Sequence, residues 1–171
     1  MHNNKKLKKG CYGFTLFEAL IYIGIAGIIL VSFIQFILTV SESRNKNYAL
    51  QETQANARAA LQIITAKIRM ADDVIFPAEG NSDSSLTLDM PNTGVNTVFS
   101  LQGGSLSINE GSGEVSLTGS RVNITGLSFA NLAAASERDN IRVQFTAEYA
   151  ITGDIRFSAS QAIQTSASLR K

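Results

Sequence analysis

The sequence predicts an α+β fold, in which one long N-terminal helix packs on a C-terminal antiparallel β-sheet domain. Three observations support this prediction: an uncharged apolar run near the N-terminus, a helical pattern that continues it, and an alternating pattern over the remainder. The 171 residues are 44% hydrophobic and only 17% charged. A chain of this length has room for about one folded domain, and the apolar run explains the low charge content.

The apolar run covers residues 19–41, which include no charged side chain, between Glu18 and Glu42. A membrane-spanning helix needs roughly 20 apolar residues at 1.5 Å each. We therefore expect residues 14–40 to form a transmembrane helix. The residues before it include four lysines and no acid, which places the N-terminus in the cytoplasm: Lys5, Lys6, Lys8 and Lys9. The rest of the chain is then exported.

The helical pattern continues over residues 41–72, which we expect to be amphipathic. Neither Gly nor Pro occurs between Gly27 and Pro77. The segment therefore predicts one helix over residues 14–71, roughly 85 Å long at 1.5 Å per residue. Apolar residues recur there at helical spacing: Leu50, Ala57, Leu61, Ile64, Ile68 and Ala71.

Residues 73–171 change to an alternating pattern and are rich in Ser, Thr, Gly and Asn, which predicts a β-rich globular domain. The clearest signal is a β-hairpin whose strands cover residues 141–151 and 155–169, around a turn at residues 152–154. A second predicted hairpin places Leu106 and Ile108 opposite Val115 and Leu117. The sheet should pack on the second half of the helix, because neither surface can bury its apolar side alone.

Two common export signals fit this N-terminus poorly. A cleaved secretory signal has about 7 to 15 apolar residues and a small-residue cleavage site, whereas this run continues to Val40. A lipidated cysteine follows its apolar run, whereas Cys11 precedes this one. An uncleaved signal anchor that carries a single-pass exported binding protein remains an alternative.

The residues ahead of the apolar run carry a more specific motif: Gly13, Phe14, Thr15, Leu16, Phe17 and Glu18. Behind a lysine-rich leader, they resemble the processing site of type IV prepilins and type II secretion pseudopilins. The resemblance implies that a prepilin peptidase removes residues 1–13 by cutting between Gly13 and Phe14. The same enzyme would methylate the new amine of Phe14.

Two further segments resemble one branch of that family, the W-type minor pilins and J-type pseudopilins. The helical pattern of residues 58–71 is similar to theirs. The stretch from Val98 to Ile108 with its Gly103–Gly104 pair, and the final Ser168, Leu169 and Arg170, look like the C-terminal part of such proteins.

Glu18 would become the fifth residue of the processed chain. A carboxylate within the hydrocarbon costs a few kcal/mol, so it persists near a helix end or beside a partner. Residues i and i+4 share a helix face, and the N-terminal end of the helix dipole favours an anion. Glu18 is therefore placed to pair with an N-terminal amine, which the resemblance assigns to a neighbouring subunit. The alternative is an interfacial residue at the helix start that reaches water.

The predicted leader contains His2 and Cys11, the sole histidine and cysteine. The processed chain would therefore have no Ser-His-Asp or Cys-His catalysis, no His/Cys zinc site and no disulfide. Lack of a disulfide departs from many major pilins and favours a minor or pseudopilin-like subunit. We expect no catalytic residue, cofactor or metal, and treat the adjacent Asp72 and Asp73 as a solvated helix end.

Two acidic loops, residues 79–85 and 109–114, lack the ligand spacing of a known calcium loop. We expect them to be solvated turns, with calcium binding as the alternative. Removal of the four leader lysines from 15 basic residues leaves 11, against 14 acidic residues. Because the remaining arginines are scattered, we expect no direct nucleic-acid binding.

The resemblance thus implies a non-enzymatic structural subunit of a periplasmic or extracellular pilus or pseudopilus, in which residues 14–40 serve as the assembly helix. Its partners would be the prepilin peptidase and methyltransferase, other major and minor pilins or pseudopilins, the inner-membrane assembly platform and, before assembly, the lipid bilayer. Secretion, twitching, adhesion and DNA uptake all remain open as the filament's task. Gly24 and Gly27 would either loosen the spanning helix or allow close helix packing.

Overall fold

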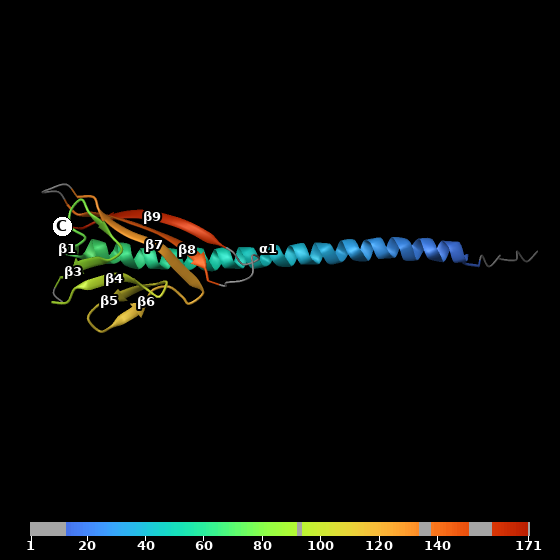
Figure 1. The fold of residues 1–171 in the computed structure, drawn as a ribbon, viewed down its shortest axis with the longest axis horizontal. Coiled ribbons are helices and arrows are strands. Elements are labelled where there is room, and N and C mark those ends of the chain that lie inside the picture. Colours follow the sequence, from blue (N-terminus) through green and yellow to red (C-terminus); the bar gives the residue numbers. More distant parts are fainter. Residues whose placement is uncertain (1–12, 92–93, 134–137, 151–158, 171) are drawn as a thin grey trace, which may run out of the picture. The chain divides into compact units, whose positions relative to one another are not determined.

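The computed structural model describes residues 13–91, 94–133, 138–150 and 159–170. Over these residues the fold is α+β, as predicted: one long helix, α1 (Leu16–Met70), precedes nine strands in two antiparallel sheets (Figure 1). The chain divides into two compact units, Met1–Glu42 and Ser43–Lys171. The second unit combines the C-terminal part of α1 with all of these strands.

Helix α1 contains 55 residues, which corresponds to about 80 Å at 1.5 Å per residue. It begins and ends within two residues of the predicted helix. The last turn carries Lys67 and Arg69, whose positive charges suit the C-terminal end of the helix dipole.

The first sheet has five strands in the order β1-β3-β4-β5-β6. Their bounds are β1 Asp73–Phe76, β3 Leu86–Asp89, β4 Thr97–Gln102, β5 Ser105–Asn109 and β6 Glu114–Ser116. Ile108 faces Val115 across the β5–β6 pair, so the second predicted hairpin is confirmed.

The second sheet has four strands in the order β2-β7-β8-β9. Their bounds are β2 Ser82–Asp83, β7 Val122–Asn131, β8 Asn140–Tyr149 and β9 Ser160–Ser168. Strands β8 and β9 pair without a break from Asn140↔Ser168 to Glu148↔Ser160. This is the main predicted hairpin. Its predicted turn at residues 152–154, together with Ile155 and Phe157, lies outside the described residues.

The antiparallel β domain is confirmed, and its strands form two sheets. The sequence did not predict this division, because alternation identifies the buried face of a strand but not its neighbour. One expectation about a loop needs correction. We expected residues 79–85 to be only a turn, whereas β2 lies within them and pairs Ser82 with Ala130 and Asp83 with Phe129.

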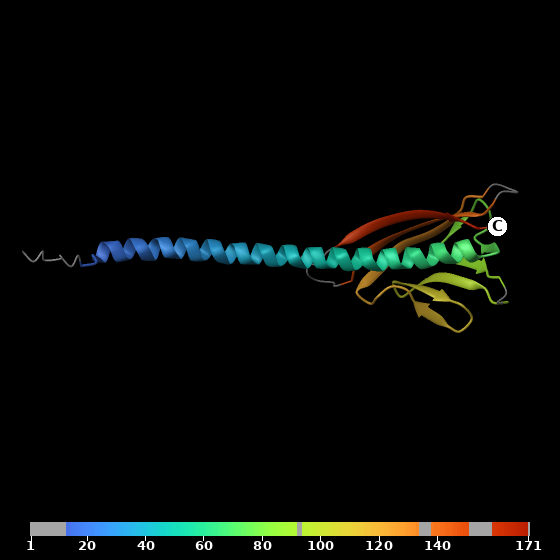
Figure 2. The same ribbon diagram turned by 180° about the vertical axis from the view of Figure 1, so that it is seen from behind.

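The core lies between the sheets and the C-terminal part of α1, along which both sheets run (Figures 1 and 2). Of the predicted helical stripe, Leu61 is partly buried and Leu50 is 39% exposed. The expectation for Leu50 was wrong: its neighbour Ala49 faces the domain instead. The buried helix residues follow spacings of three and four: Ala49, Thr53, Ala57, Ala60, Ile64 and Ile68.

The two sheets meet where β5 begins. The backbone N–H of Ile124 in β7 donates to the carbonyl oxygen of Gly104 at 2.7 Å. Gly104 has a φ of +83°, and a Cβ there would lie 1.9 Å from Oδ1 of Asn123. Only glycine combines this backbone conformation with so close an approach, so Gly104 allows the sheets to join.

Three polar contacts tie α1 to the loops of its own unit. The Asn56 side-chain oxygen accepts the Gly119 N–H at 2.8 Å, and the Arg121 guanidinium donates to the Tyr48 hydroxyl at 2.9 Å. Lys67 forms an ion pair with Glu110. These contacts hold the loops around β6 against the helix.

Candidate functional site

The candidate site is the start of α1, where Gly13, Phe14 and Thr15 precede the first helical residue. The Thr15 hydroxyl accepts the backbone N–H of Glu18 at 3.2 Å. The backbone carbonyl oxygen of Thr15 accepts the N–H of Ala19 at 3.1 Å. Thr15 is therefore the N-cap, and Thr15 with Glu18 matches the Ser/Thr-x-x-Glu pattern of a capping box. We did not predict this role, although the three-residue spacing from Thr to Glu is its sequence signal.

The predicted cleavage point lies on exposed chain. Phe14 is 67% exposed, and its ring stacks on Tyr22 with a centroid separation of 5.6 Å. A Cβ at Gly13 would meet nothing within 4 Å. No packing of the described residues therefore requires glycine here.

The Glu18 side chain is exposed in the first turn of α1. The capping bond uses the backbone N–H of Glu18 and leaves its carboxylate uninvolved. Within the described residues, no cationic side chain forms a salt bridge with Glu18. The carboxylate is thus available to a cation from outside the described chain, and the N-terminal end of the helix dipole supports its negative charge.

The first part of α1 exposes apolar side chains on every face. Their exposure ranges from 47% at Ile21 to 81% at Leu16. The most apolar window of this helix has a mean hydropathy of 2.5 and no buried residue. The Ser32 and Thr39 hydroxyls donate to the Ile28 and Gln35 carbonyls at 2.9 and 3.0 Å, so the helix satisfies them internally.

A helix that is apolar all round is stable only when lipid or other protein covers it. By length and composition, α1 could span a membrane. Gly24 and Gly27 lie in this segment, and a Cβ at either would meet open space, so neither glycine is required by packing within the chain.

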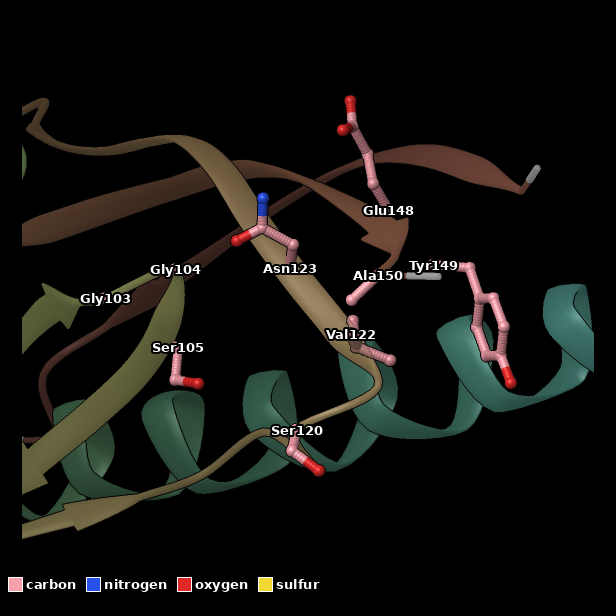
Figure 3. Close-up of a pocket in the computed structure, with 9 residues that line it drawn as sticks. All are labelled: Gly103, Gly104, Ser105, Ser120, Val122, Asn123, Glu148, Tyr149 and Ala150. Atoms are coloured by element: carbon pink, nitrogen blue, oxygen red, sulfur yellow. The ribbon is translucent and has the colours of Figure 1, made fainter. Parts of the chain in front are cut away.

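In the β domain, a hollow of about 280 Å³ opens between the Gly103–Gly104 turn and the ends of β7 and β8 (Figure 3). Its polar side chains come from Ser105, Ser120, Asn123, Glu148 and Tyr149. Figure 3 shows the Glu148, Asn123 and Tyr149 side chains pointing in different directions. They do not converge on one point, so this arrangement assembles no acid, base and nucleophile in reach of one another.

The acidic loops use their carboxylates locally. Asp83 accepts the Ser85 backbone N–H at 3.1 Å. Outside these loops, Asp73 at the start of β1 accepts the Val74 N–H at 3.0 Å. Glu110 pairs with Lys67. Among the residues that the structure describes, no three His, Cys, Asp or Glu side chains gather in a group that could hold a metal ion.

Comparison of the chain with models of protein families, with curated proteins and with solved structures finds no match. The fold therefore defines the class at the level of architecture: an α+β chain with an exposed apolar N-terminal helix long enough to cross a membrane.

Proposed function

We propose that this chain is a minor type IV pilin or pseudopilin, a structural subunit of a pilus or of a type II secretion or competence pseudopilus. One observation carries the proposal. The Gly13–Phe14 bond lies on exposed chain immediately before a capped helix, and that helix presents an apolar surface on all sides. Such a helix suits lipid before assembly and neighbouring helices after it.

In this proposal the chain enters the inner membrane with its N-terminus in the cytoplasm. A prepilin peptidase cuts between Gly13 and Phe14, and the new Phe14 amine is methylated. The helix then starts at Leu16, the third residue of the processed chain, because Thr15 is its N-cap. Glu18 pairs with the amine of a neighbouring subunit, where the low dielectric strengthens the attraction between the charges.

The other unit supplies the surface of the subunit. Its two sheets and the C-terminal part of α1 share one core, so the β domain is held on a helix that continues from the apolar segment. The function is mechanical: the apolar helix packs and the β domain contacts other subunits or cargo.

Processing is tested by expressing the full chain with and without an active prepilin peptidase, comparing the wild type with Gly13→Val. The N-terminus is read by intact mass. We expect the wild type to begin at Phe14 only when the peptidase is present, and the variant to keep residues 1–13. Since a side chain at Gly13 meets open space, loss of cleavage would report recognition by the peptidase.

A matched control places the same change farther along, at Gly27, where a Cβ also meets nothing within 4 Å. Gly27→Val should be cut like the wild type. A wild-type chain that keeps residues 1–13, beside a substrate that the same peptidase does cut, would favour the uncleaved signal anchor.

A further inference from the structure

Strand β9 forms one edge of the four-stranded sheet, because it pairs with β8 on one side and is last in the sheet order. Its nine residues, SQAIQTSAS, include no charged residue, no proline and no glycine. Both views show it as the outer strand of this sheet (Figures 1 and 2). An exposed edge of this kind offers unpaired backbone N–H and C=O groups.

The register identifies which residues direct these groups outward. Tyr149 donates its N–H to Ala159 at 2.8 Å, and Leu169 donates to Asp139 at 3.2 Å. Hydrogen-bonded pairs alternate along an antiparallel ladder, so the odd-numbered residues of β9 bond to β8. The even-numbered residues direct their N–H and C=O away from it, and all of them are exposed: Ser160, Ala162, Gln164, Ser166 and Ser168.

The other sheet edges lack this combination. Strand β2 has two residues and β6 has three. Strand β1 has four residues, carries Asp73 and has a register shift between Val74 and Phe76. Shortness, charge and bulges are the usual protections of an edge, and β9 has none of them.

We propose that the β9 edge is a docking site for an extended strand of another protein, which joins the four-stranded sheet by backbone pairing. Such strand addition draws affinity from main-chain hydrogen bonds and specificity from alternate side chains. On the inner face the added strand would lie beside the half-buried Gln161, Ile163 and Thr165. On the outer face it would lie beside Ser, Ala and Gln. The fitting segment therefore alternates apolar and uncharged polar residues over about nine positions.

A second copy of this chain fits the edge less well. Antiparallel self-pairing would centre on Gln164, and on the inner face it would place Ile163 beside Thr165 and Gln161 beside Ala167. A second β9 would therefore bring Ile163 as its one large apolar side chain, whereas a strand with apolar residues at alternate positions would cover more of that face.

The test uses the full chain, purified in detergent, and a fluorescent synthetic peptide, NISVQFTAQY, which keeps the alternation of β8 and replaces Arg142 with Ser and Glu148 with Gln. Fluorescence anisotropy measures peptide binding. Gln164→Pro removes one outward N–H without removing a bond to β8, whereas Gln164→Ala changes the same side chain and keeps the N–H. We expect saturable binding to the wild type and to Gln164→Ala, and a loss of at least about tenfold in Gln164→Pro.

A second variant covers the case in which proline unfolds the strand. Ala162→Lys with Ser166→Lys places two charges on the exposed edge, and Gln144→Lys places one on the exposed face of β8. We expect the first to abolish binding and the second to retain it. Equal binding to all variants would indicate exchange with β8 and overturn the proposal, as would no binding to the wild type.

Pairing of β9 with β9 of a second copy is tested separately, by disulfide crosslinking. In a Cys11→Ser background, Gln164→Cys would form a disulfide-linked dimer if two β9 strands paired about Gln164. That dimer would overturn the assignment to another protein. None of these results depends on cleavage at Phe14, so the docking site and the proposed function fail separately.

Discussion

Thr15 and Glu18 lie three residues apart at the start of α1, and their side chains have different roles. The Thr15 hydroxyl satisfies the Glu18 backbone N–H, which stabilises the helix end by about 1 kcal/mol in typical cases. The carboxylate of Glu18 takes no part in that bond. Substitutions at the two positions can therefore separate helix capping from charge pairing.

We predict that Glu18→Gln lowers incorporation into filaments at least about tenfold, because an amide of the same shape cannot neutralise a subunit's amine. Thr15→Ala, which removes the cap but keeps the carboxylate, should change incorporation little. Quantitative immunoblots of sheared filaments, with cleavage at Phe14 checked in parallel, measure both. Incorporation of Glu18→Gln at the wild-type level would show that Glu18 is only an interfacial residue.

Ile63 and Ile64 are adjacent in α1 but differ in burial. Ile64 is fully buried in the core, whereas Ile63 is 36% exposed. Ile64→Ala should lower the free energy of unfolding by about 2–5 kcal/mol, through lost transfer energy and a cavity. Ile63→Ala should cost less than about 1 kcal/mol. Urea unfolding of the detergent-purified chain, followed by circular dichroism, compares them; equal losses would mean that the packing of α1 is wrong.

The helical sequence pattern predicted some of the buried residues of α1 and missed others. The helical spacing correctly identified Ala57, Ile64 and Ile68 as core residues. It selected Leu50 over Ala49, because hydrophobicity ranks leucine first, whereas Ala49 is fully buried and Leu50 is exposed. The cap at Thr15 could have been predicted from its spacing to Glu18.

At the scale of elements, β1 and β3 carry an unfavourable pair. Asp73 and Asp89 are directly opposite in the register, and like charges in that position are destabilising. We predict that Asp89→Asn raises the free energy of unfolding by roughly 0.2–1 kcal/mol at low salt. The gain should shrink at 1 M salt, where the Debye length is about 3 Å.

Urea unfolding at low and high salt measures that gain. The control is Glu79→Gln, an exposed acid outside the strands. A gain in Asp89→Asn that persists at 1 M salt, or an equal gain in Glu79→Gln, would contradict a pairwise charge effect.

Helices and strands that have a periodic sequence pattern were predictable, but the arrangement of the strands into two sheets was not. Uninterrupted helical spacing indicated α1, and alternation indicated β5, β6, β8 and β9. The division into two sheets depends on long-range contacts such as the Ile124–Gly104 hydrogen bond, for which alternation contains no signal. Strand β2 has only two residues, too few for a periodic pattern.

At the scale of the molecule, one continuous helix has two different surfaces. Between residues 19 and 41 it exposes no charged side chain, and its last part contributes one face to the core of the second unit. Composition alone predicted this division, since charged residues are absent from 19–41 and frequent after Glu42. The free edge of β9 was not predictable, because a sequence pattern does not identify which strand ends a sheet.

The most direct measurement is the intact mass and N-terminal sequence of the chain recovered from shed filaments or from its native membrane. A minor pilin or pseudopilin should begin at Phe14 and be one methyl group heavier on its amine. A chain that still begins at Met1, in cells whose prepilin peptidase processes other substrates, would contradict that assignment and leave an uncleaved membrane anchor.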